Sequence, residues 1–224
     1  MIRKIFDDPS GGIINLRYLK RMMESFSCLN IDEKEQKELL SLFLLIGVKL
    51  SSVWNHKNNY IKIEKDLISK AKAKPLLVGK KDNQIDYSKE LFNEFDEFLV
   101  QVKSCLDHLV KVLAIIFGKS KWTLRSFSGK GDDVIKSLKN NTPAQYKMIV
   151  PGLIKTIEEH QIWLTDIISA RDRINHFIDG GINFESFIVV CQKTEKAEQL
   201  IIPKWSESQS ISELLLRQLN IRDS

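Results

Sequence analysis

Apolar residues recur every three or four positions through most of the chain, a spacing that predicts amphipathic helices. The two clearest segments run from Asp32 toward the lysines before Pro75, and over Asp86–Phe117. Asp32, followed three residues later by Glu35, has the pattern of a capping box at a helix start. Gly118 suits the end of the second helix, because glycine readily adopts the left-handed conformation found there. Long helices therefore dominate the predicted fold.

Three further stretches have helical spacing: Ile13–Phe26, Val134–Leu138 and Gly152–Phe177. Beyond residues 180 and 181, both glycine, the pattern changes to β-branched and aromatic residues. Phe184–Cys191 and Leu200–Trp205, separated by polar residues, predict a small β-hairpin.

A last amphipathic helix is expected over Ile211–Leu219. The predicted fold class is all-α, a bundle of long helices with a small C-terminal β-hairpin and a terminal helix. We expect an N-terminal extension with a short helix over residues 1–31, a helical bundle over 32–181, and the hairpin and last helix packed on it over 182–224.

The composition is that of a globular protein, with 43% hydrophobic and 28% charged residues among 224. Cys28, Cys105 and Cys191 lie far apart, which argues against a disulfide framework or a zinc site. The four histidines lack the H-E-x-x-H spacing of metalloenzymes, so neither a metal nor a cofactor is expected. The N-terminus lacks the apolar core of a signal peptide, and the longest apolar run, Leu39–Val48, is short for a bilayer. We expect a cytoplasmic protein without membrane association.

The net charge of +5 is small, but its distribution is uneven. Residues 56–81 and residues 119–155 each hold eight Lys or Arg against two acidic residues. Two such basic stretches are the arrangement that binding of a polyanion needs. The alternative is that both stretches are solvated surface.

The segment Gly152–Phe177 carries the most informative polar residues. Its apolar stripe, continued by threes and fours, passes through His160 and Arg171, and a buried guanidinium needs a partner or a wet cleft. Asp172 and His176 are four residues apart, so the carboxylate is placed to orient the imidazole. Arg171 and His176 are about 140° apart on an ideal helix. They can converge at the helix edge or across a two-fold axis.

An arginine beside a histidine suits the cleavage of a phosphodiester. The histidine can take the proton of a ribose 2′-hydroxyl or give one to the leaving oxygen. The arginine can hold the non-bridging oxygens as negative charge builds. No metal is needed for this chemistry.

The run from Arg171 to His176, Arg-Asp-Arg-Ile-Asn-His, resembles the R-x4-6-H motif of HEPN domains, including the polar residue after the arginine. Residues 95–107 are similar to the second core helix of that family, and the resemblance covers roughly residues 32–180. It implies a dimeric, metal-independent ribonuclease of the defence or toxin type, with RNA cleaved between protomers. Arg171 and His176 would be catalytic, supported by Asp172 and Asn175.

The resemblance also implies partners. RNA would be bound by basic residues, for which the predicted set is Lys119, Lys121, Arg125, Lys130 and Arg173. A homodimer is expected, together with an antitoxin or defence-system protein. Some HEPN toxins carry a modified tyrosine two residues after the histidine, whereas this chain has Ile178 there. Regulation by that route is therefore not supported.

Three alternatives stay open. Arg171, Asp172 and His176 can form a structural ion-pair network. The chain can also be a non-catalytic HEPN-like module that binds RNA, a nucleotide or a protein. A membrane-surface protein is a third reading, but no stretch pairs its lysines with a strong aromatic face.

Overall fold

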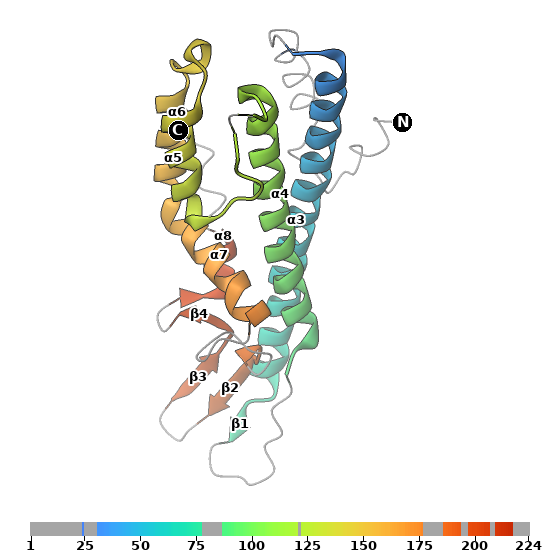
Figure 1. The fold of residues 1–224 in the computed structure, drawn as a ribbon. Coiled ribbons are helices and arrows are strands. Elements are labelled where there is room, and N and C mark those ends of the chain that lie inside the picture. Colours follow the sequence, from blue (N-terminus) through green and yellow to red (C-terminus); the bar gives the residue numbers. More distant parts are fainter. Residues whose placement is uncertain are drawn as a thin grey trace. The chain divides into compact units, whose positions relative to one another are not determined.

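The computed structural model describes most of the chain, and its elements are drawn in Figure 1. The described residues are 24, 31–77, 87–120, 122–176, 186–193, 197–206 and 209–216, without the side chains of 77, 175, 176, 205 and 206. The helices of at least six residues are α3 (Glu33–Ala73), α4 (Lys89–Phe117), α5 (Asp132–Asn141), α6 (Val150–Glu159), α7 (Gln161–His176) and α8 (Ile211–Leu216). The predicted all-α class with a small C-terminal hairpin is confirmed. The helix expected over Ile13–Phe26 lies outside the described residues except at Glu24, which is helical.

The chain divides into two compact units, each built from two separate stretches of sequence. The first unit comprises residues 1–55 and 99–168, and the second comprises residues 56–98 and 169–224. The helices α3, α4 and α7 each contribute residues to both units. The sequence-based boundaries after residues 31 and 181 stay predictions.

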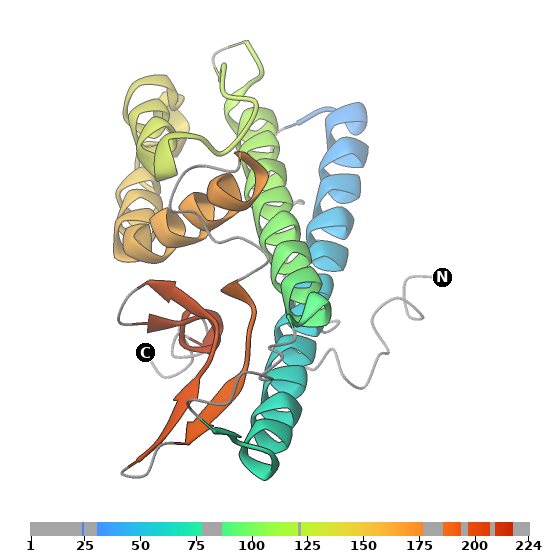
Figure 2. The same cartoon turned by 90° about the horizontal axis from the view of Figure 1, so that it is seen from below.

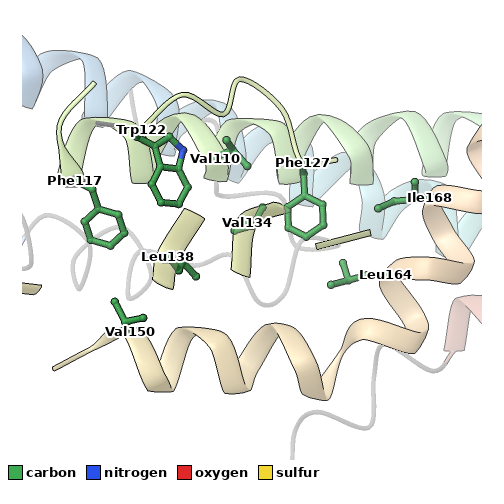
Figure 3. Close-up of a cluster of buried hydrophobic side chains, with 9 residues drawn as sticks. All are labelled: Val110, Phe117, Trp122, Phe127, Val134, Leu138, Val150, Leu164 and Ile168. Carbon is green, nitrogen blue, oxygen red and sulfur yellow. The ribbon is translucent and has the colours of Figure 1, made fainter. Parts of the chain in front are cut away.

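The first unit is a helical assembly around an apolar core, shown in Figure 3. Its buried side chains come from α4, from the loop that follows α4, and from α5, α6 and α7. They are Val110, Phe117, Trp122, Phe127, Val134, Leu138, Val150, Leu164 and Ile168. A second cluster joins α3 to α4 through Leu39, Leu42, Ile46, Val112 and Ile115.

The ends of the long helices follow the signals in the sequence. The Asp32 carboxylate accepts a hydrogen bond from the Glu35 backbone N–H at 2.7 Å, which satisfies one of the free donors at the start of α3. Gly118 follows α4 with a φ of 92°, in the left-handed region that glycine tolerates. Its carbonyl accepts the Trp122 N–H at 3.1 Å, so the chain turns back toward the core.

Asp107 of α4 holds the loop that follows α4, which carries the core residues Trp122 and Phe127. Its Oδ1 accepts the Phe127 backbone N–H at 2.8 Å and pairs with Lys103 one turn earlier on the helix. Lys103 and Asp107 are four residues apart on α4, a spacing at which opposite charges on a helix pair. One carboxylate oxygen thus stabilises a buried backbone donor and neutralises a half-buried ammonium.

The prediction of a single helix over Gly152–Phe177 is wrong, because the helix breaks at His160. The φ and ψ of His160 are −104° and 5°, and its N–H reaches the Ile157 carbonyl at 3.2 Å in a tighter turn. The Gln161 amide then donates to the Asp132 carboxylate at 2.8 Å, which ties the start of α7 to α5. Neither glycine nor proline marks this break, so the local sequence gave no sign of it.

A tight turn at Gly129-Lys130-Gly131 leads into α5. Asp132 is the first residue of α5, and Gly131 is the cap with a φ of 101°. Lys130 has a φ of 56°, an uncommon value for a residue with a side chain. The Asp132 carboxylate is thereby available to Gln161.

The second unit contains the β structure, and its hairpin is shorter than expected. β2 (Val190–Lys193) pairs antiparallel with β3 (Glu198–Ile201), and β1 (Leu76–Leu77) adds to β2 in parallel. The predicted strand Leu200–Trp205 is interrupted at Pro203, which has no N–H for a ladder. The chain resumes as β4 (Lys204–Ser206), paired with β5 (Gln209–Ser210).

An aromatic cluster forms the core of the second unit. The ring of Phe187, which is fully buried, lies edge-on to Phe92 at a centroid distance of 5.3 Å and tilts against Phe95 at 5.9 Å. Tyr60 of α3 also packs against Phe95, with the ring centroids 6.2 Å apart. Sequence-distant segments of this unit are thus joined through α4.

Glu64 is a buried carboxyl in the same unit, with an exposed fraction of only 4%. Burial raises the pKa of Glu64, while hydrogen bonds from Ser212 and Tyr60 oppose that rise and the negative charge of Glu213 adds to it. The Tyr60 hydroxyl is 3.5 Å from Oε1 of Glu64, and burial raises the pKa of Tyr60 as well. The fold therefore favours the neutral form of Glu64.

α3 is the one described helix that is long and apolar enough to cross a membrane by length and composition. Of its apolar window, 28% is buried in the protein. Core helices of soluble proteins meet the same criterion, and α3 buries Leu39, Ile46 and Tyr60 completely or nearly so. One such helix is weak evidence for a membrane protein.

Replacing Asp107 tests its role as the anchor of the loop. Asp107→Ala should lower the free energy of unfolding by about 1–3 kcal/mol, because the Phe127 N–H loses its partner inside the protein. Asp107→Asn keeps an acceptor oxygen and should recover much of that loss. Urea denaturation measures both, and equal losses in the two variants would contradict the account.

Replacing Glu64 tests the effect of its burial on stability. The folded pKa of Glu64 lies above its unfolded value, so the contribution of Glu64 to stability is greatest below the unfolded pKa and is lost as pH rises through the folded pKa. Glu64→Gln removes this loss. Its melting temperature should exceed that of wild type by a margin that grows from about pH 4 to about pH 7. Glu33→Gln, on the exposed start of α3, is the control, and a constant margin for Glu64→Gln would refute the argument.

Candidate functional site

The last turns of α7 carry the predicted motif, and they lie beside α4 in both Figure 1 and Figure 2. Ala170 is fully buried and Ile174 is 8% exposed, so these two residues fix which face of the helix turns inward. Arg171 follows Ala170 directly and is half-buried. Arg171 was expected on the buried face of the helix, and its side chain is instead 35% exposed.

The guanidinium of Arg171 has one buried edge and one accessible end. Its Nε is buried and has no hydrogen-bond partner among the described residues, whereas the side chain as a whole is 35% exposed. At the other end, Nη1 lies 3.4 Å from Oδ1 of Asp172, at the outer limit of a hydrogen bond. Asp172 is 44% exposed, so water competes for this contact. Arg171 is therefore only loosely engaged at its accessible end.

Asp96 of α4 lies within electrostatic range of this arginine. Its Oδ1 is buried and has no hydrogen-bond partner in the described part of the chain. Burial raises the pKa of Asp96, the neighbouring Glu97 raises it further, and the positive charge of Arg171 lowers it. Asp96 and Arg171 are thus close enough to interact electrostatically, although their unpartnered atoms do not form a hydrogen bond with each other.

Sequence reasoning missed Asp96 as a site residue. It lies 75 positions before Arg171, so only the three-dimensional fold brings the two within electrostatic range. A local signal did exist. Asp96 follows Phe92 by four residues and precedes Leu99 by three, which places a carboxylate on an otherwise apolar helix face. Such a charge in a partly buried position is a recognised mark of a candidate site.

Asn175 and His176 are the last two residues of α7, and their side chains lie outside the described part of the structure. The pairing of Asp172 with His176 therefore stays a prediction. The backbone does continue as a helix to His176, as the four-residue spacing requires.

The predicted RNA-binding residues fall in different units. Lys119, Arg125 and Lys130 belong to the first unit and are exposed, and Lys119 forms an ion pair with Glu38 at 2.6 Å. Arg173 belongs to the second unit with Arg171 and is also exposed. Lys121 lies outside the described residues. The five residues are thus not shown to form one surface.

The other basic stretch, residues 56–81, is described as far as residue 77 and belongs to the second unit, which also contains Arg171. It is not simply solvated surface. Lys57 is 2% exposed, while Lys62, Lys65 and Lys70 are exposed.

The described residues offer few other groups for catalysis. No set of three His, Cys, Asp or Glu side chains within them is placed to hold a metal ion. Burial raises the pKa of Cys105 to about 12, so this thiol is protonated and a poor nucleophile at neutral pH. His160 lies at the break between α6 and α7 and belongs to the first unit, so it does not continue the face of Arg171 as expected.

Comparisons with protein-family models, with curated proteins and with solved structures gave no match.

Removing Arg171 tests whether it lies beside Asp96. Without the guanidinium, burial and Glu97 act unopposed, so Arg171→Ala should raise the pKa of Asp96 further. A carboxyl-detected NMR titration measures this pKa. Arg173→Ala, which removes an exposed cation from the same helix, is the matched control. An Asp96 pKa that responds equally to both substitutions would contradict the geometry.

Proposed function

We propose that this protein is a metal-independent endoribonuclease of the HEPN type, acting in a prokaryotic defence or toxin system in the cytoplasm. The observation that carries the proposal is the state of Arg171. Its Nε is buried, and its accessible end makes only a 3.4 Å contact with a half-exposed aspartate. A guanidinium held in this way is available to bind a phosphate through two N–H groups.

The reaction would begin with attack of the ribose 2′-oxygen on the adjacent phosphorus. The 2′-O–H bond breaks as the new O–P bond forms, and the bond from phosphorus to the 5′-oxygen then breaks. His176 would accept the first proton or supply the one that the leaving 5′-oxygen needs. Arg171 would stabilise the charge on the non-bridging oxygens. The products are a 2′,3′-cyclic phosphate and a 5′-hydroxyl.

A homodimer would complete this site. Because Arg171 and His176 diverge by about 140° on one ideal helix, a second copy of α7 across a two-fold axis would bring an arginine and a histidine together. Asn175 and Asp172 would orient the imidazole. Lys119, Lys121, Arg125, Lys130 and Arg173 would contribute the electrostatic attraction for RNA. An antitoxin or a defence-system protein would control the activity.

A non-catalytic helical module that binds a protein partner is the second candidate. Three large apolar side chains of the first unit favour it, because Met148, Ile149 and Ile162 are 94%, 52% and 76% exposed. Exposed apolar residues of this size are common at protein-binding surfaces. In that case Arg171 and Asp172 would be structural.

Cleavage of RNA in the presence of EDTA separates the two candidates. The wild-type protein should cut single-stranded RNA and leave cyclic-phosphate ends. Arg171→Ala and His176→Ala should each reduce the rate by about a hundredfold or more, because each removes a group that acts in the transition state. Lys111→Ala, which removes an exposed cation of α4 outside the proposed RNA-binding set, is the control for loss of charge, and it should cut at a rate near that of wild type.

Melting temperatures must accompany these rates. Inactive variants that melt near the wild-type temperature support catalysis by Arg171 and His176. Wild-type protein that leaves RNA intact, or cleavage that survives in both variants, would eliminate the nuclease assignment.

A further inference from the structure

The second half of α3 carries a positive charge that the first half lacks. Residues 33–55 hold three lysines and three acidic residues, whereas residues 56–73 hold five lysines and two acidic residues. Neither of those two acidic residues offsets the lysines at the surface. Glu64 is only 4% exposed, and Asp66 pairs with Lys70 at 2.7 Å. The outer surface of this half of α3 is therefore basic.

Three exposed lysines on this half of α3 lie along one side of the helix, and we call them the lysine strip: Lys62, Lys65 and Lys72. On an ideal helix they fall within about 80° of one another and over about 15 Å of its length. None of the three forms an ion pair with another described residue, whereas Lys70 beside them does. The strip is thus an array of cations that the described part of the protein does not neutralise.

The stability of the helix explains only part of this strip. Lys72 lies in the last turn of α3, where a cation interacts favourably with the helix dipole. Lys62 and Lys65 lie about three and two turns before the end of the helix, beyond the reach of that effect. Like charges at neighbouring positions on a helix face repel each other and destabilise the helix. These two lysines therefore favour a role outside the fold.

The residues around the strip favour a nucleic-acid backbone over a membrane or a protein as its partner. The exposed residues of this half of α3 are asparagine, serine, lysine, aspartate and alanine, with no large apolar side chain among them. A membrane-binding helix buries an apolar face in the lipid, and a protein interface needs large buried anchors. A phosphate backbone needs only cations and hydrogen-bond donors. Asn58 and Ser69, exposed on the same side of the helix as the lysines, offer such donors.

We propose that the lysine strip binds the phosphate backbone of single-stranded RNA. This inference rests on the proposed ribonuclease function and extends it, because the strip lies outside the basic residues assigned above to RNA binding. Arg171 and the whole strip belong to the same compact unit. Contacts to phosphates carry no sequence information, so the strip adds affinity and not specificity. It binds the ground state and the transition state alike, so its loss should raise KM and leave kcat nearly unchanged.

Two matched triple variants of the full chain test the strip. The first removes its charges and consists of Lys62→Ala, Lys65→Ala and Lys72→Ala. The control removes three exposed lysines outside both basic stretches of the sequence and consists of Lys34→Ala, Lys37→Ala and Lys111→Ala. Both variants lower the net charge equally, so a difference between them reports where the charges lie. Both should melt near the wild-type temperature, because the substituted side chains are exposed.

The dissociation constant is measured by fluorescence anisotropy, with a short single-stranded RNA whose 2′-hydroxyls are methylated so that it cannot be cut. At about 50 mM salt the strip variant should bind at least about tenfold more weakly than wild type. Its plot of log K against log salt should be shallower by about 2, since each lost phosphate contact removes about 0.7 from the slope. The control should change the affinity by less than about threefold and the slope by less than about 0.5. Arginine at all three strip positions keeps the charge and should restore binding.

The outcomes separate the strip from the nuclease. If wild-type protein cuts RNA, the strip variant should show a raised KM with kcat within about twofold. If wild-type protein binds RNA without cutting it and the strip variant loses that binding, the ribonuclease function fails and the strip stands. Equal losses of affinity and slope in the two triple variants would overturn the strip. Tighter binding of wild-type protein to phosphatidylserine vesicles or to polyglutamate than to RNA would overturn it as well.

Discussion

The burial of apolar side chains along the whole of α4 is the constraint on which both units depend. Leu91, Phe95 and Leu99 are fully buried near its start, and Val110, Ile115 and Phe117 are at most 2% exposed near its end. In the first unit these residues pack against α3 and against the helices α5 to α7. In the second unit Phe95 packs against both Tyr60 and Phe187. These contacts cover the apolar faces of α4. The presence of a polar side chain on one of those faces therefore calls for a specific structural or functional explanation.

Two polar residues of α4, Asp107 and Asp96, differ in whether their buried atoms have partners. Asp107 bonds to a backbone N–H and to Lys103, so it stabilises a loop that closes the core. Asp96 and Arg171 instead leave buried atoms unpartnered within the described part of the chain, although each carries the charge that the other lacks. Proteins usually satisfy buried polar groups, and departures from that rule gather at functional sites. This contrast, rather than the motif alone, directs attention to the end of α7.

Much of the fold could be predicted from spacing and capping residues. The bounds of α3 follow from Asp32 and from the apolar repeat, and the end of α4 follows from Gly118. The break at His160 could not be predicted, because a side-chain contact from Gln161 to a helix 29 residues earlier helps to fix it. The interruption of the second predicted strand at Pro203 could have been predicted, because proline has no backbone N–H to donate to a neighbouring strand. At the site, Arg171 and Asp172 were found from local spacing, whereas Asp96 depends on the long-range packing of two helices.

The central claim is that the accessible end of Arg171 binds a phosphate of RNA. The most direct test is an NMR titration of the arginine side-chain N–H signals with a short RNA in which the reactive 2′-hydroxyl is replaced by hydrogen. Arg171 should shift and saturate at the lowest concentrations, while Arg173, exposed on the same helix, should shift weakly and without saturation. An Arg171 signal that stays unchanged while RNA binds elsewhere, or that moves no more than that of Arg173, would contradict the account.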